Sequence, residues 1–189
     1  MVAARVFEPC YIGGWSAAEH WGLTEQIFRT IVVFTTRTVG DRRPKIQSTE
    51  FWVRKVARSR MFGARIVWRG RVKVHVSDPT KTLVDLIDDS AIGGGARMVE
   101  SILRAYLASS ERDMERLLEY ASRMRNGAIF KRLGFLLERA GVDDFSILSP
   151  IRQGLTGGNA KLDPMLPAER LITRWRLWVP KNWAESRRD

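Results

Sequence analysis

The sequence predicts an α+β fold, because its hydrophobic pattern changes period near residue 78. Before that point, short β-branched and aromatic runs are typical of strands, and after it apolar residues recur at helical spacing. We expect an antiparallel or mixed sheet in residues 1–78, with one early helix, packed by a layer of about four helices in residues 79–141. Residues 142–189 are expected to form a Gly/Pro-rich return and a final strand, so that residues 1–189 make a single domain.

The expected strands lie in residues 26–39, 49–57, 64–70 and 71–78. In the last segment Val72, Val74 and Val76 alternate with polar residues, which is the pattern of a half-buried strand. The segment VGDRRP at 39–44 predicts the turn between the first two strands.

The early helix is expected within YIGGWSAAEHWGLTEQ, residues 11–26, where Ser16, Glu19 and His20 lie close together. A hydrolase nucleophile elbow is not indicated, because the Gly-x-Ser-x-Gly pattern ends in alanine and His20 lies one helical turn beyond Ser16. The Ser-x-x-Glu spacing instead predicts a capping box, in which Ser16 accepts from the N–H of Glu19 and Glu19 accepts from the N–H of Ser16. Gly22 suits the left-handed position that ends such a helix.

The later helices follow from their start and stop signals. Asp78 stands at the N-cap position of the first, and Pro79 at its first helical position. Glycines in IGGGA at 92–96 separate it from a second helix, a third begins near residue 111, and a fourth covers about 127–140. Gly141 suits the residue that follows the end of the fourth helix.

The C-terminal segment RLITRWRLWV at 170–179 alternates basic with apolar residues and predicts an edge strand. Trp175, Trp178 and Trp183 lie in or beside it. Three large aromatic side chains favour burial, so we expect this segment to fold back and dock on the rest of the chain.

Composition excludes several function classes. No apolar run reaches the length of a membrane span, and the first residues do not have the pattern of a secretory signal. The single cysteine, Cys10, fits a cytoplasmic protein. Cys10, His20 and His75 have no metal-ligand spacing, and the glycine motifs of nucleotide-binding loops are missing. We therefore predict a non-enzymatic protein with no catalytic residue, no metal and no cofactor.

The strongest functional signal is a net charge of +11, concentrated in residues 1–78, which hold 14 basic and 6 acidic residues. Basic residues lie among Trp52, Phe62 and Trp68 in this region. Such a face suits nucleic-acid phosphates or an acidic partner protein, and the alternative is a sheet whose outer face is merely solvated by arginine. The candidate binding residues are Arg37, Arg42, Arg43, Lys45, Arg54, Lys55, Arg58, Arg60, Arg65, Arg69, Arg71 and Lys73.

Four segments together resemble one family, the antitoxins of AbiEi type. YIGGWSAAEHWGLTEQ is similar to the start of the family's C-terminal antitoxin domain, and VSDPTKTLVDLID with the glycine-rich helix start is similar to its middle. LLEYASRMRNGAIFKRLGFLLE (117–138) and LDPMLPAERLITRWRLWV (162–179) resemble its later parts. The match runs in order across nearly the whole chain.

The resemblance implies a bacterial antitoxin that neutralises a nucleotidyltransferase toxin of AbiEii type and represses its own operon. It implies no catalytic residue. The winged helix-turn-helix that usually precedes this domain is not expected here, since only about ten residues precede YIGG, which leaves operator binding open while DNA contact remains possible. The alternatives are a nucleic-acid-binding protein that uses charge alone and an enzyme with an unrecognised site.

Overall fold

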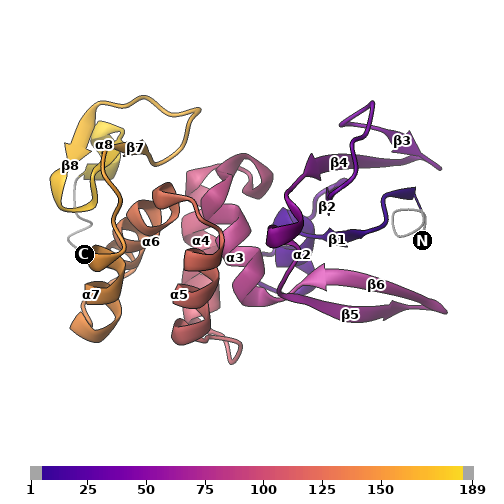
Figure 1. The fold of residues 1–189 in the computed structure, drawn as a ribbon, viewed down its shortest axis with the longest axis horizontal. Helices are drawn as coiled ribbons and strands as arrows, with labels where there is room; N and C mark the ends of the chain where they lie inside the picture. Colours follow the sequence, from indigo (N-terminus) through magenta and orange to yellow (C-terminus); the bar gives the residue numbers. More distant parts are fainter. Residues whose placement is uncertain (1–5, 185–189) are drawn as a thin grey trace.

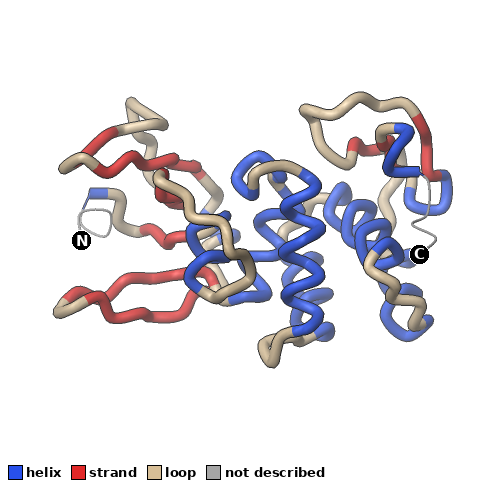
Figure 2. The backbone as a smooth tube through the Cα atoms, turned by 180° about the vertical axis from the view of Figure 1, so that it is seen from behind, coloured by secondary structure: helices blue, strands red, loops and turns tan. Residues whose placement is uncertain are grey.

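The computed structural model describes residues 6–184 and has the predicted α+β fold. A six-stranded mixed sheet lies at one end of the molecule and a three-stranded sheet near the other, with most of the helices between them (Figure 1). Figure 2 shows the same arrangement from behind, with the helices in blue separating the two groups of strands. None of the helices in the described range is long and apolar enough to cross a lipid bilayer.

The larger sheet has the strand order β3-β4-β2-β1-β6-β5. Its strands are β1 (Cys10–Ile12), β2 (Thr30–Thr35), β3 (Lys45–Ile46), β4 (Thr49–Lys55), β5 (Ala64–Arg69) and β6 (Val72–Ser77). Pairs β2–β4 and β1–β6 are parallel and the others antiparallel, so the sheet is mixed. All four predicted strand segments are confirmed, and residues 36–44 form the connection that the turn signal at 39–44 indicated.

The early helix, α2 (Gly14–His20), exists, but the predicted capping box is wrong. The N-cap residue is Gly13, and no side chain caps the helix, because the helix starts two residues before Ser16. The Ser16 hydroxyl accepts from the backbone N–H of Val32 at 3.0 Å and so attaches α2 to β2. The carbonyl of Glu19 accepts from the N–H of Gly22 at 3.1 Å, just after the end of the helix.

Glycines shape both ends of α2. Gly14 has φ +58, and a Cβ there would lie 2.8 Å from the carbonyl oxygen of Ile92, so the turn from β1 into the helix requires glycine. Gly22 has φ +67 and ends the helix as predicted. The close approach at Gly14 is a long-range contact, and the Ser-x-x-Glu pattern carries no information about it.

Helix α3 (Pro79–Asp88) lies at the centre of the molecule. Its predicted N-cap is confirmed, because the Asp78 carboxylate accepts from the N–H of Lys81 at 2.7 Å. Every residue from Pro79 to Ile87 is buried. Around α3 pack α2 and three further helices, α4 (Ala96–Ala108), α5 (Met114–Arg123) and α6 (Gly127–Arg139). The expected helical layer is therefore arranged around α3, and α2 and α3 connect it to the sheet.

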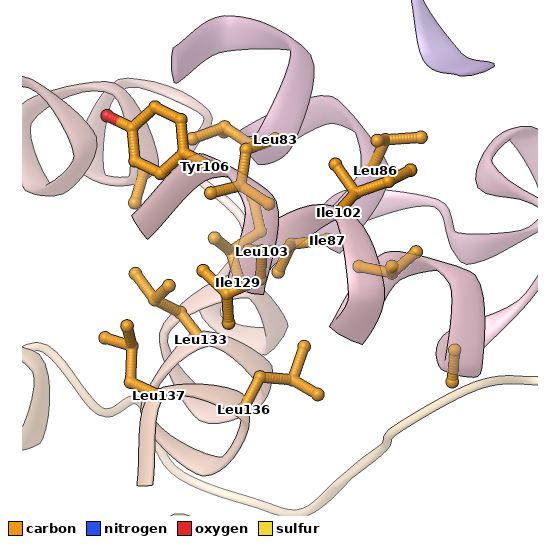
Figure 3. Close-up of a cluster of buried hydrophobic side chains, with 14 of the residues drawn as sticks. Leu83, Leu86, Ile87, Ile102, Leu103, Tyr106, Ile129, Leu133, Leu136 and Leu137 are labelled. Atoms are coloured by element: carbon orange, nitrogen blue, oxygen red, sulfur yellow. The ribbon is translucent and has the colours of Figure 1, made fainter. Parts of the chain in front are cut away.

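Three helices contribute the part of the main apolar core that is labelled in Figure 3. The labelled side chains are Leu83, Leu86 and Ile87 of α3, Ile102, Leu103 and Tyr106 of α4, and Ile129, Leu133, Leu136 and Leu137 of α6. Apolar residues recur at helical spacing in all three helices, as the sequence indicated. The third helix starts at Met114, a few residues later than expected, because Asp113 caps it by accepting from the N–H of Arg116.

A charged pair is buried inside this core. The side chain of Lys81 is fully buried and that of Asp85 is 2% exposed, and the ammonium group donates to the carboxylate one turn away. Tyr11 of β1 joins them: its hydroxyl donates to Asp85 Oδ2 at 2.9 Å and accepts from Lys81 Nζ at 3.0 Å. Burial raises the pKa of the Asp85 carboxyl, and the charge of Lys81 opposes that shift. The triad fixes α3 against the sheet.

Arg132 of α6 holds the other end of α3. Its guanidinium donates to the carbonyl oxygens of Ile87 at 2.9 Å and Asp88 at 2.7 Å. These carbonyls belong to the last turn of α3 and have no partner within the helix. Arg132 Nε also donates to the carbonyl of Lys161 at 2.9 Å, so one side chain joins three segments of the chain.

The segment 170–179 is extended at both ends, but it does not form the single continuous edge strand that its alternation predicted. The segment forms β8 (Arg170–Ile172), a turn of 3-10 helix (Thr173–Trp175) and β9 (Leu177–Val179), which pairs antiparallel with β8. Arg176 has φ +50, and this left-handed residue reverses the chain where the alternating pattern indicated continuous extension. With β7 (Ala160–Lys161) the hairpin makes the smaller sheet, in which β9 is central.

Docking of the tryptophan-rich segment is confirmed. Trp175 and Trp183 are buried and Trp178 is partly buried. Trp175 lies against Gly134 of α6, where a Cβ would be 2.1 Å from the indole carbon Cζ3. The remaining helices of this part are α7 (Phe145–Gln153) and the short α8 (Lys181–Ala184). Gly141, with φ +87, follows α6 as predicted.

We expect Lys81→Met to lower the free energy of unfolding by about 3–5 kcal/mol, because it leaves the Asp85 carboxylate buried without its charged partner. Urea unfolding followed by tryptophan fluorescence measures the change. The matched control is the double variant Lys81→Met/Asp85→Leu, which removes both charges and should recover much of the loss. Equal stability of the two variants would contradict this account.

Candidate functional site

The predicted basic residues form three groups in and around the larger sheet. The first group comes from β4 and from the residues between β2 and β4. The second lies in the 3-10 turn Arg58–Arg60, and the third on the β5–β6 hairpin, which extends away from the helices (Figure 1). The groups are, in order, Arg37, Arg42, Arg43, Lys45, Arg54 and Lys55; Arg58 and Arg60; and Arg65, Arg69, Arg71 and Lys73.

Three of the twelve form salt bridges. Arg54 binds Asp89, and Arg60 binds Asp88 with 2.8 Å between Nη1 and Oδ2. Arg65 binds Glu111 at 2.8 Å on the surface. Arg54 and Arg60 are partly buried, and desolvation lowers the pKa of Arg54, assisted by the neighbouring Arg42. These two arginines join the sheet to the C-terminal end of α3, which is a structural role.

The other nine form no salt bridge with any residue between 6 and 184, and their charges remain available to a partner. The first group has a partly buried aromatic support, because the Arg43 guanidinium lies 3.8 Å from the centre of the Trp52 ring. Lys55 Nζ donates to Thr38 Oγ1 at 2.7 Å, and Arg37 donates to the carbonyl of Val6 at 3.2 Å. Each of these contacts orients a cation without neutralising it.

The β5–β6 hairpin combines charge with exposed apolar surface. Trp68 is 59% exposed and Ile66 is 54% exposed on β5, which is an edge strand of the sheet. Lys73 Nζ lies 5.1 Å from the centre of the Trp68 ring. Arg69 Nη2 donates to His20 Nδ1 at 3.0 Å, and Arg71 is exposed at the turn. Cations beside an exposed indole suit contact with phosphates and bases.

The aromatic residues near the basic segment differ in their exposure to solvent. Trp52 and Phe62 are partly buried and pack against the core, whereas Trp68 is exposed. The Phe62 ring lies 4.9 Å from Lys81 Nζ and 5.0 Å from the Tyr120 ring. The sequence did not identify Ile66 as an exposed residue. Its exposure depends on which strands pair with β5, and the local sequence ARIVWR does not indicate that pairing.

The residues that suggested a hydrolase do not form a nucleophile pair. Ser16 is bonded to the backbone of β2, and His20 is bonded to Arg69. Burial lowers the pKa of His20, and the charge of Arg69 lowers it further. Among residues 6–184, no group of three or more His, Cys, Asp or Glu side chains is close enough to hold a metal ion.

The chain shares its fold with a protein of known structure. No protein-family model matches the chain, and no curated protein matches it. The chain is similar in structure to the RV2827C protein from Mycobacterium tuberculosis, whose crystal structure is known, with a TM-score of 0.62 and 17% sequence identity. The alignment covers 93% of this chain and 64% of that one. At this identity the likeness establishes a shared fold alone.

We expect Arg60→Gln to lower the free energy of unfolding by about 2 kcal/mol, because charge-assisted hydrogen bonds to Asp88 and to the Met124 carbonyl are lost. The matched control is Arg58→Gln in the same turn, which is exposed and should change stability by less than about 0.5 kcal/mol. Chemical unfolding of both variants checks the assignment. It would be contradicted by equal effects at the two positions.

Proposed function

We propose that the protein is a non-enzymatic antitoxin of AbiEi type, which neutralises a cognate nucleotidyltransferase toxin of AbiEii type. The observation that carries this proposal is the ordered resemblance of four segments across nearly the whole chain. The fold is compatible with their acting as one unit. Tyr11 of the first segment bonds to Asp85 of the second, and Gly134 of the third contacts Trp175 of the fourth.

The basic residues give this antitoxin a surface for its partners. Nine cations of the predicted set form no salt bridge with the described residues, and they lie on the larger sheet, away from the tryptophan-rich end. Such a surface attracts an acidic face of a protein or the phosphates of operator DNA. Phosphate contacts supply affinity without reading the base sequence, so autoregulation at a specific operator needs a further DNA-reading element.

Co-expression with the cognate toxin tests the antitoxin function. We expect growth of toxin-expressing bacteria to be restored when this protein is induced, and not when its start codon is removed. The missing start codon keeps the messenger RNA and removes only the protein, so rescue is assigned to the polypeptide. Continued growth arrest with the intact, folded protein would contradict the proposal.

A second candidate is a nucleic-acid-binding protein that acts through charge alone. The nine cations that form no salt bridge with a described residue and the exposed Trp68 beside Lys73 favour it. The two candidates differ in their specificity, since charge alone gives similar affinity for unrelated sequences.

Binding to unrelated DNA duplexes, followed by fluorescence anisotropy, tests this candidate. The logarithm of the association constant should fall linearly with the logarithm of salt concentration, with a slope of about −0.9 per phosphate contact. The variant Arg42→Glu/Lys45→Glu/Arg71→Glu should lose most of the affinity. The control Arg97→Glu/Arg112→Glu/Arg170→Glu changes the net charge equally with exposed residues elsewhere. Equal loss in the two variants would exclude a defined binding surface.

A further inference from the structure

Strands β1 and β6 are paired at a single position, Ile12 with Val76. On the N-terminal side of that pair, both strands line a cavity of about 630 Å³. Glu8, Cys10 and Tyr11 line it from the β1 side and Lys73, Val74 and His75 from β6, and Arg58 and Met61 follow from the segment after β4. A cavity of this size is typical of sites for small molecules.

The cavity combines an apolar wall with positive charge. Met61 contributes partly exposed apolar surface beside the buried Tyr11 and Val74, and the ring of Tyr11 is held in place by stacking on Phe34 at 4.8 Å between centroids. Arg58 and Lys73 bring two cations, and neither forms a salt bridge with a described residue. Glu8 is the only acidic side chain among the lining residues. The cavity therefore favours an anion.

The strand edges add hydrogen-bonding groups. In an antiparallel pair, alternate residues direct their backbone N–H and C=O groups away from the partner strand. On β6 these groups point away from β5, toward β1, and ladder pairing with β1 is present only at Val76. The groups nearer the hairpin are thus left for a ligand with its own donors and acceptors, such as the edge of a nucleobase.

A second cavity, of about 640 Å³, provides a comparison. It lies between α2 and the other side of the β5–β6 hairpin. Its cation, Arg69, is already bonded to His20, and Glu19 in the same lining balances its charge. Of these two cavities, the one between β1 and β6 combines two cations that form no salt bridge with a described residue and a strand edge that is largely unpaired.

We propose that the cavity between β1 and β6 binds a nucleoside phosphate, with the base against Tyr11, Met61 and the β6 edge and the phosphate between Arg58 and Lys73. Tight binding needs both the base and the phosphate of the ligand, because the apolar wall contacts only the base and the two cations contact only the phosphate. Arg58 and Lys73 also belong to the basic surface described above, but the site is tested by the binding of a mononucleotide and so holds or fails separately from toxin neutralisation and from DNA binding.

Cys10 provides the test, because it is the only cysteine of the chain and lines the cavity. Burial, followed by the charge of Glu8, raises the pKa of its thiol to about 11, so its reaction with a disulfide reagent at pH 8 is slow but measurable. An equimolar mixture of AMP, GMP, CMP and UMP is the probe. At about ten times the dissociation constant, it should slow the reaction about tenfold. Adenosine alone or inorganic phosphate alone should protect far less.

Two variants of equal net charge separate this site from general attraction to a basic protein. Arg58→Ala/Lys73→Ala should lose protection, and Arg97→Ala/Arg170→Ala, on exposed residues elsewhere, should retain it. Thermal unfolding of each verifies that it is folded. No protection of the wild-type protein would overturn the proposal. Protection that persists in Arg58→Ala/Lys73→Ala, or that disappears equally in both variants, would overturn it as well.

Discussion

The fold depends on the burial of α3 together with the charged pair that it carries. A helix with every residue from Pro79 to Ile87 buried must satisfy its polar groups internally, and it does so at three places. The carboxylate of Asp78 caps the start of the helix, and the Tyr11 hydroxyl completes the hydrogen bonds of Lys81 and Asp85. The Arg132 guanidinium donates to the carbonyl groups of the last turn. Each partner comes from a different part of the chain, so the same bonds that satisfy α3 position the sheet and the later helices around it.

The excess of positive charge has two uses in this molecule. Arg54 and Arg60 neutralise Asp89 and Asp88 at the C-terminal end of α3, where a cation also complements the helix dipole. Cations farther along the sheet, such as Arg43, Arg71 and Lys73, remain on the surface or beside the cavity. A basic sequence segment therefore contains both supports of the fold and candidates for recognition, and only the position of the acidic residues separates them.

Features set by short-range rules could be predicted from the sequence, and those set by strand pairing could not. The cap at Asp78 and the helix ends at Gly22 and Gly141 follow from local geometry. The capping box failed because α2 starts at Gly14, which lies against the carbonyl of Ile92, and the single strand at 170–179 failed because Arg176 adopts a left-handed conformation. The basic segment was identified, but its salt bridges and the cavity depend on distant residues and on the single β1–β6 pair.

Several hydrogen bonds of α3 and α4 join residues that are far apart in the sequence, and this separation affects how the chain folds. The hydrogen-bond partner of Tyr11 is Asp85, 74 residues later in the sequence, and the partner of the Ala96 N–H is Asp163, 67 residues later. Native structure rich in such distant contacts forms slowly, because loop entropy is lost before the contacts form. On the ribosome, β1 and α2 emerge well before the helix that covers them. The N-terminal half must therefore remain incomplete, with apolar strands exposed, until α3 has been synthesised.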